Sequence, residues 1–378
     1  MRRYLCPERV FVEGRFRSDL AVVLADGIIE SVLPVESLPS DVAREVLAGS
    51  LAPGFIDLQV NGGGDLLFND EPSVEGLRHM AAAHAGLGTT GFLPTVITDR
   101  PAVLTAALQA VERASGKVPG ILGLHVEGPF IQPAKSGVHD TRQIRQMDEA
   151  TLEALSGFRA GRLLITLAPE CVAPGTIRRL VDAGATVAAG HTNATFEQLQ
   201  AAMDEGLSGF THLFNAMSQL TAREPGAVGA ALAAGSAWAS IIVDGHHVHP
   251  AVMRVAYSCL GPERLVLVSD AMPPVGGQST RFMLQGREIT VESGHCVSAE
   301  GKLAGAAIAL ADAVREAHRF MGVTIDQAVQ MATESPARAL GLDGGRVAAG
   351  QPADLVLLND RFEVVATWVA GQPVLPLT

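Results

Sequence analysis

Residues 187–217, VAAGHTNATFEQLQAAMDEGLSGFTHLFNAM, decide the fold of this chain. Two short apolar runs in this stretch each end at a histidine, His191 and His212. Between them, residues 194–205 carry apolar side chains at helical spacing, with Thr195 among the candidate caps. The order strand, helix, strand predicts one βα unit, and two neighbouring parallel strands bring both imidazoles to the same rim of a sheet.

The composition predicts a large folded core. Hydrophobic residues make up 48% of the 378 residues and charged residues 18%, which leaves room for a barrel of roughly 250 residues and a smaller domain. A net charge of −12 and an aromatic content of 4% argue against binding to nucleic acid or to an anionic membrane. A small phosphorylated ligand stays possible, because it needs only a local cluster of positive groups.

The four cysteines form no CxxC pair, and neither a signal peptide nor a membrane-length apolar run is recognisable. These observations predict a soluble protein of the cytoplasm.

Apolar segments alternate with helix-like segments between residues 52 and 344, which predicts an α/β fold with a (β/α)₈ TIM-like barrel. We expect its strands at residues 54–60, 90–95, 121–126, 163–168, 186–190, 208–211, 238–243 and 265–269.

Both ends of the chain have the alternating pattern of antiparallel strands. Neither residues 1–51 nor residues 345–378 contain enough strands for a core of their own, so we expect them to form one small β-sandwich domain together. Residues 278–300 form a hairpin-like insertion, and one interpretation is that this insertion pairs with the small domain.

Polar residues follow the expected barrel strands. Glu127, His191 and His212 come at three strand ends, and a carboxylate with two imidazoles is a ligand set for a catalytic metal with an open position for water. Asp270 ends the last strand, where a carboxylate can accept and return the proton of that water. Taken alone, each histidine could be a structural residue and Asp270 a helix cap. The chain has no GxSxG, GxGxxG or P-loop motif, so a serine hydrolase or a nucleotide cofactor is disfavoured.

Several motifs resemble the amidohydrolase superfamily, and within it the enzymes that deacetylate phosphorylated amino sugars. The matching segments, in chain order from residue 53 to 310, are PGFIDLQVNGGG, GLHVEGPFI, KSGVHD, GHTNAT, THLFNAM, REPG, VDGHHVH, VSDAM and GKLAGAAIAL. The terminal β segments are also similar to the second domain of that family.

The resemblance implies roles for further residues. One divalent ion per subunit, Zn²⁺ or else Fe²⁺, Co²⁺ or Mn²⁺, would bind Glu127, His191 and His212. Arg223 would meet the sugar phosphate, typically in the site of the neighbouring subunit of a homodimer. The other implied substrate contacts are Val138, His139, Asn215, Ala216, His247, Leu303, Ala304 and Gly305.

This chain departs from the superfamily at the end of the first strand. Many members have His-x-His there to hold a second metal, whereas this chain has Gln59 and Asn61. Amides are poor ligands for such an ion, so we expect one metal, with both amides hydrogen-bonded beside the site. His246 and His249 flank His247, and either could take its role.

The implied reaction is hydrolysis of N-acetyl-D-glucosamine 6-phosphate to D-glucosamine 6-phosphate and acetate. The nearest alternative is N-acetylgalactosamine 6-phosphate, which differs in one hydroxyl. More distant alternatives are a cyclic amidohydrolase or deaminase and a non-catalytic barrel scaffold.

Overall fold

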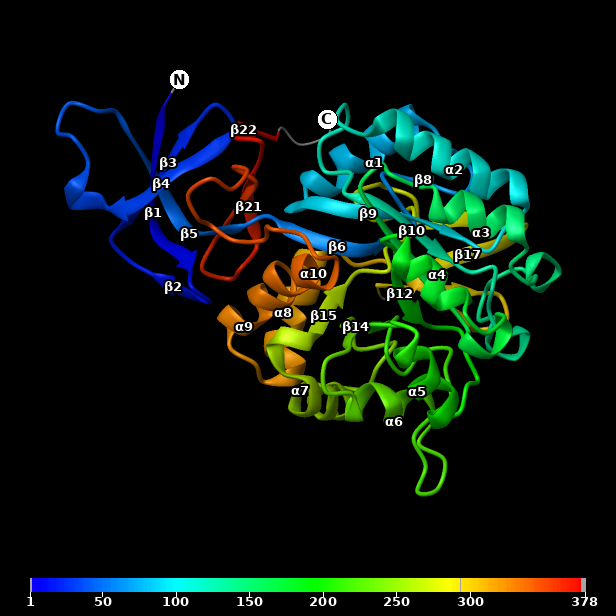
Figure 1. Cartoon of the computed structure of the whole chain (residues 1–378). Helices are drawn as coiled ribbons and strands as arrows, with labels where there is room; N and C mark the ends of the chain where they lie inside the picture. The colour runs from blue at the N-terminus through cyan, green and yellow to red at the C-terminus, as the bar shows by residue number, and fades with distance from the viewer. Residues whose placement is uncertain (1, 293, 375–378) are drawn as a thin grey trace.

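A parallel eight-stranded barrel forms the centre of the molecule in the computed structural model, which describes residues 2–292 and 294–374 (Figure 1). Its strands pair in the order β15-β14-β13-β12-β11-β10-β9-β6. They span β6 Phe55–Val60, β9 Thr89–Ile97, β10 Gly123–Glu127, β11 Arg162–Leu167, β12 Thr186–Ala189, β13 Gly209–Phe210, β14 Trp238–Ile242 and β15 Leu265–Val268. All eight overlap an expected strand, and the predicted (β/α)₈ barrel is confirmed.

The junction of β6 and β15 is held by a buried carboxylate. Val60 bridges to Ala271 just beyond β15. Below this bridge, the fully buried Asp57 accepts hydrogen bonds from the hydroxyl of Ser269, from the Ser269 amide (3.2 Å) and from the Gln59 amide (3.2 Å). Asp57 therefore joins the first and last strands of the barrel beside Asp270.

Helices cover the outside of the barrel (Figure 1). They span α1 Val74–Ala85, α2 Pro101–Ala114, α3 Glu149–Ser156, α4 Thr176–Asp182, α5 Phe196–Asp204, α6 Gly226–Ala233, α7 Pro250–Arg264, α8 Leu310–Met321, α9 Ile325–Met331 and α10 Glu334–Ala339. Short 3₁₀ turns occur at Val35–Ser37, Pro133–Lys135, Thr141–Gln143 and Pro169–Cys171. In α5, which joins the two histidine-bearing strands, Thr195 and Gln198 form a reciprocal capping box. No described helix is long and apolar enough to cross a membrane.

The two ends of the chain share a second sheet, with strand order β22-β21-β20-β5-β1-β3-β4 and β2 beside β1. Its strands are β1 Arg3–Val12, β2 Arg15–Arg17, β3 Leu20–Ala25, β4 Ile28–Pro34, β5 Arg44–Pro53, β20 Leu355–Leu358, β21 Val364–Val369 and β22 Gln372–Pro373. The N- and C-terminal segments meet where β5 pairs with β20. One expectation is wrong: β1 and β5 are parallel, because the β3–β4 hairpin on the far side of β1 lets the chain re-enter in the same direction. Met1, residue 293 and residues 375–378 lie outside the described residues.

The insertion after β15 does not pair with the terminal sheet, so that interpretation is wrong. Its strands, β16 Arg281–Leu284, β17 Arg287–Glu292, β18 His295–Ser298 and β19 Leu303–Ala306, form a separate antiparallel sheet. The apolar face of this sheet packs instead on Ile97 at the end of β9, on Met272 beyond β15, and on Leu67 of the small hairpin β7 Gly62–Gly63 and β8 Leu66–Leu67. Backbone hydrogen bonds from Ala306 to Asp270 and from Met272 to Ala306, both 3.0 Å, fix the sheet beside the barrel mouth.

Candidate active site

Four polar side chains converge at the carboxyl ends of the barrel strands. Glu127 is the last residue of β10, while His191, His212 and Asp270 follow β12, β13 and β15. His191, His212 and Asp270 have positive φ angles of 49°, 36° and 51°. Non-glycine residues rarely adopt this conformation, and those that do cluster at functional sites. The chain thus bends sharply where each side chain leaves its strand.

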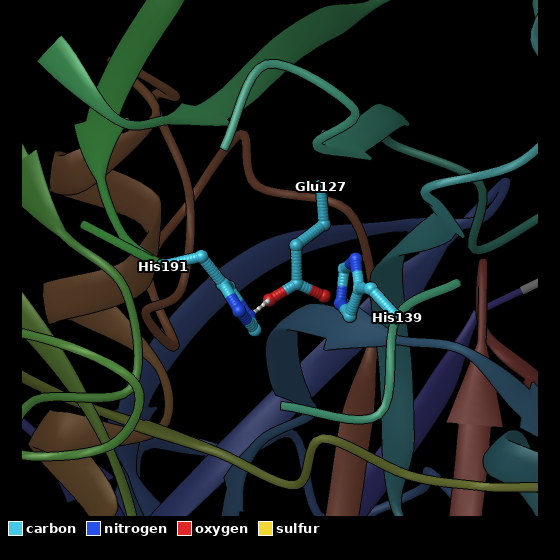
Figure 2. A group of neighbouring side chains, drawn as sticks. All are labelled: Glu127, His139 and His191. Carbon is cyan, nitrogen blue, oxygen red and sulfur yellow. Dashed lines mark hydrogen bonds and ion pairs between the residues drawn. The ribbon is translucent and has the colours of Figure 1, made fainter. Parts of the chain in front are cut away.

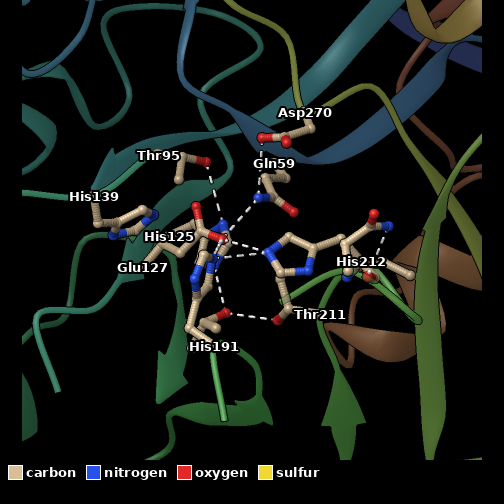
Figure 3. Close-up of polar contacts among 12 residues, drawn as sticks. Gln59, Thr95, His125, Glu127, His139, His191, Thr211, His212 and Asp270 are labelled. Atoms are coloured by element: carbon tan, nitrogen blue, oxygen red, sulfur yellow. Dashed lines mark hydrogen bonds and ion pairs between the residues drawn. The ribbon is translucent and has the colours of Figure 1, made fainter. Parts of the chain in front are cut away.

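The structure brings Glu127, His191 and His212 to one point (Figure 3). The Nε2 atoms of His191 and His212 lie 3.2 and 2.9 Å from Oε1 of Glu127, and 3.1 Å from each other. Ligands bound at about 2.0–2.1 Å in a tetrahedral zinc site lie roughly 3.3 Å apart. One oxygen and two imidazole nitrogens with this spacing fit a single divalent cation.

Neighbouring groups orient these imidazoles. The backbone carbonyl of Lys135 lies 2.8 Å from Nδ1 of His191, which leaves Nε2 free to face Glu127. His139 adjoins the same cluster, since its ligand atom lies within 4.8 Å of those of Glu127 and His191 (Figure 2). Its Nδ1 is 2.7 Å from the hydroxyl of Thr98. Glu127, His139 and His191 thus form a second group that could hold a metal ion, and His139 also lines the cavity described below.

Two amides connect the cluster with Asp270. The Gln59 amide donates to Oε1 of Glu127 (3.0 Å) and to Oδ1 of Asp270 (3.1 Å), as Figure 3 shows. The Asn61 amide donates to the same oxygen of Asp270 at 2.6 Å. Because their N–H groups point at the carboxylates, both residues act here as hydrogen-bond donors.

Burial and charge separate the protonation behaviour of the two acids. Burial, assisted by the charge of Glu127, raises the pKa of Asp270 to about 6. Burial also opposes the charge of Glu127, but hydrogen bonds from His191 and His212 hold its pKa well below the ordinary value. Burial next to His191 lowers the pKa of His139 to about 3, so that imidazole is neutral. Of the two carboxyl groups that line the cavity floor, Asp270 thus has the higher pKa and Glu127 stays ionised.

A cavity of about 440 Å³ opens above the cluster, a size suited to a small ligand. His247 lines it, with Nδ1 held 2.6 Å from a carboxylate oxygen of Asp244. Burial works against ionisation of Asp244, yet the hydrogen bond and charge of His247 lower its pKa to about 2. The two neighbouring histidines have other contacts: His249 accepts the Ala251 amide at the start of α7, and the His246 ring stacks on His295 with 4.0 Å between centroids.

Most other expected contact residues also line this cavity, namely Asn61, Val138, His139, Asn215, Ala216, Leu303, Ala304 and Gly305. Gln59 lies just beneath it, and Arg223 is not among the lining residues. Arg223 is exposed on the loop between β13 and α6, which extends away from the body of the subunit (Figure 1).

The sequence reasoning missed several residues of this cavity. Lys302, Met272 and Leu284 line the wall next to the insertion, and Thr98 and Asp244 orient two of its histidines. The position of Asp244 at a strand end, three residues before His247, was a usable signal. Lys302 belongs to the matching segment GKLAGAAIAL, but the sequence did not place it in the cavity wall, because its position depends on how the insertion folds.

A (β/α)₈ barrel with this cluster at the carboxyl ends of its strands defines a class: the hydrolytic barrel enzymes built around a metal site. The chain belongs to the amidohydrolase family, whose model matches residues 50–374.

Among similar proteins, an N-acetylgalactosamine-6-phosphate deacetylase of Shewanella sp. (strain ANA-3) is 42% identical over 96% of this chain and 94% of its own. The crystal structure of N-acetylglucosamine-6-phosphate deacetylase from Pasteurella multocida has a TM-score of 0.95 at 32% identity, over 99% of each chain. A mutant of the enzyme from Mycobacterium smegmatis in complex with N-acetyl-D-glucosamine 6-phosphate has a TM-score of 0.91 at 31% identity, over 99% of each chain.

Proposed function

We propose that this chain hydrolyses the acetamide of N-acetyl-D-glucosamine 6-phosphate and releases D-glucosamine 6-phosphate and acetate. The observation that carries the proposal is the meeting of Glu127, His191 and His212 within 3.2 Å beside the buried Asp270. Similarity over nearly the whole chain to deacetylases of hexosamine 6-phosphates supports the substrate class.

Glu127, His191 and His212 would hold the divalent ion, which supplies Lewis acidity to a water and to the amide carbonyl. Asp270 accepts the proton of the attacking water and then donates it to the departing amine. Its Oδ1 is fixed by Gln59 and Asn61, which leaves Oδ2 for the transfer. Neutral His139, anchored through Nδ1, has Nε2 available for the carbonyl or a sugar hydroxyl.

N-acetyl-D-galactosamine 6-phosphate is the second candidate substrate. The relative that is 42% identical has this specificity in its name, whereas both structures named above are glucosamine enzymes. The two sugars differ only at the C4 hydroxyl, and a buried group that hydrogen-bonds one epimer stays unpaired with the other. Relative rates therefore decide between them.

We also propose one Zn²⁺ per subunit, a homodimer and a cytoplasmic location. The amides of Gln59 and Asn61 donate to carboxylates where a second metal would need acceptors, which favours a single ion. Arg223 lies outside its own cavity on an extended loop, which favours its use by a neighbouring subunit. All four cysteines are free, as is usual in a reducing compartment.

Acetate release from both hexosamine 6-phosphates, from N-acetylglucosamine without phosphate and from an N-acetylated amino acid tests this function. We expect activity on the sugar phosphates, its loss with a chelator and its recovery with Zn²⁺. If the metal-loaded protein releases acetate from neither sugar phosphate, the proposed function is wrong.

A further inference from the structure

One lysine lies in the cavity wall that the insertion provides. Lys302 stands at the end of the turn between β18 and β19, and residues 301–305 all line the cavity. Among the described lining residues, Lys302 is the only lysine or arginine. The four-stranded sheet therefore adds an ammonium group to a cavity in which the other basic side chains of the described lining are imidazoles.

The turn holds the backbone of Lys302 while its ammonium group stays free. The Ser298 amide donates to the Lys302 carbonyl at 2.9 Å, and the Gly301 amide to the Ser298 carbonyl at 2.9 Å. The nearby Glu300 carboxylate accepts the Ser298 hydroxyl at 2.7 Å. Within residues 2–292 and 294–374, no hydrogen bond or salt bridge of the exposed Lys302 ammonium is found; its charge only adds to the hydrogen bond from Ser298 in lowering the pKa of Glu300.

The carboxylates of the cavity favour a nearby cation when the ligand is an anion. Glu127 and Asp270 both line its floor, and a phosphate dianion would be repelled without a positive partner. Arg223 of the same subunit is not among the lining residues, so within one chain Lys302 is the one ammonium or guanidinium group of the described lining that can meet the anion.

We propose that Lys302 binds the 6-phosphate of the substrate and so selects phosphorylated over unphosphorylated N-acetylhexosamines, an inference that rests on the proposed function. The acetamide at C2 has to lie at the Glu127 cluster on the cavity floor. The phosphate at C6, on the other side of the sugar ring, then points to the mouth, where the exposed Lys302 stands. A lysine binds phosphate as a flexible point charge, which suits a group at the rim.

Lys302→Met tests the inference, because it keeps the length of the side chain and removes the charge. For the sugar phosphate we expect kcat/KM to fall about 10- to 100-fold, mostly through KM, as for loss of a hydrogen bond to a charged group. For unphosphorylated N-acetylglucosamine the fall stays below about threefold. Lys302→Arg recovers most of the loss, and Lys117→Met, at an exposed lysine in the turn after α2, serves as the matched control.

A second measurement is independent of turnover. The chain has three lysines, Lys117, Lys135 and Lys302, so amine acylation read by peptide mass spectrometry reports each one. Inorganic phosphate should protect Lys302 in the metal-loaded protein and leave Lys117 unprotected.

Equal losses on both sugars, no loss, or acylation of Lys302 that phosphate does not change would each overturn the inference. If the wild-type protein releases acetate from no sugar phosphate, the proposed function fails, and the acylation result still decides whether Lys302 binds the anion.

Discussion

Asp270→Asn tests the proton-transfer role most directly, because the structure isolates that role from folding and metal binding. The carbonyl oxygen of an asparagine can still accept the hydrogen bonds that Gln59 and Asn61 give to Oδ1, at 3.1 and 2.6 Å. The new amide nitrogen then takes the position of Oδ2, where it cannot accept a proton. Glu127, the other carboxylate of the cluster, is held by two imidazoles and has a strongly lowered pKa, so it cannot substitute.

The expected loss of turnover follows because Glu127 cannot replace Asp270 as the base. General acid–base catalysis contributes about 10²- to 10⁴-fold, or about 3–5 kcal/mol of the barrier, and the loss should appear in kcat. Acetate release gives kcat and KM, and elemental analysis gives the metal content, which should remain at the wild-type level. Asp41→Asn, at an exposed site near the start of β5, is the matched control.

Near-normal turnover of Asp270→Asn would refute the role assigned to this carboxylate. Loss of metal together with activity would instead mean that Asp270 acts as a ligand, so the two measurements separate the explanations.

Four further predictions follow from the same contacts. Because the carboxylate is the working form of Asp270, kcat/KM should fall about tenfold per pH unit on the acidic side of its pH profile, below an apparent pKa at or under 6. Asn61→Leu removes a hydrogen bond to the charged carboxylate, so it should raise this apparent pKa by about 1–2 pH units. An unchanged apparent pKa in that variant contradicts the prediction. Chelation followed by titration with Zn²⁺ should restore full activity at about one ion per chain, and a requirement for two contradicts the single site. Asp57→Ala should lower the free energy of unfolding, measured by urea denaturation, by about 2–4 kcal/mol, because it leaves two buried backbone amides unpaired. Ser269→Ala should lower the free energy of unfolding by less, and equal effects of the two variants would contradict the junction described. Mixing inactive Arg223→Ala and Asp270→Asn subunits should recover about a quarter of wild-type activity if the arginine serves a neighbouring site. Half of the dimers then pair one variant with the other, and each mixed dimer has one complete site of two. No recovery contradicts that geometry.

The sequence determined the barrel and the core of the site. Apolar runs that alternate with helical periodicity specify parallel strands, and the carboxyl ends of parallel strands share one rim. Residues that end such runs, like His191 and His212, are therefore placed together by local pattern alone. The cap of α5 at Thr195 was among the candidates for the same reason, since a capping box is contained within four residues.

Only the tertiary structure decided which distant groups meet. Gln59 lies 211 residues from Asp270, and a sequence pattern specifies what its amide can donate but not to which oxygen. The insertion could be recognised as strands, yet its packing on Met272 rather than on the terminal sheet depends on which apolar faces fit together, and that choice brought Lys302 to the cavity. The parallel pairing of β1 with β5 has the same origin. Periodicity is encoded in neighbouring residues, whereas partners across the fold are selected by the shapes and charges that remain once the local elements have formed.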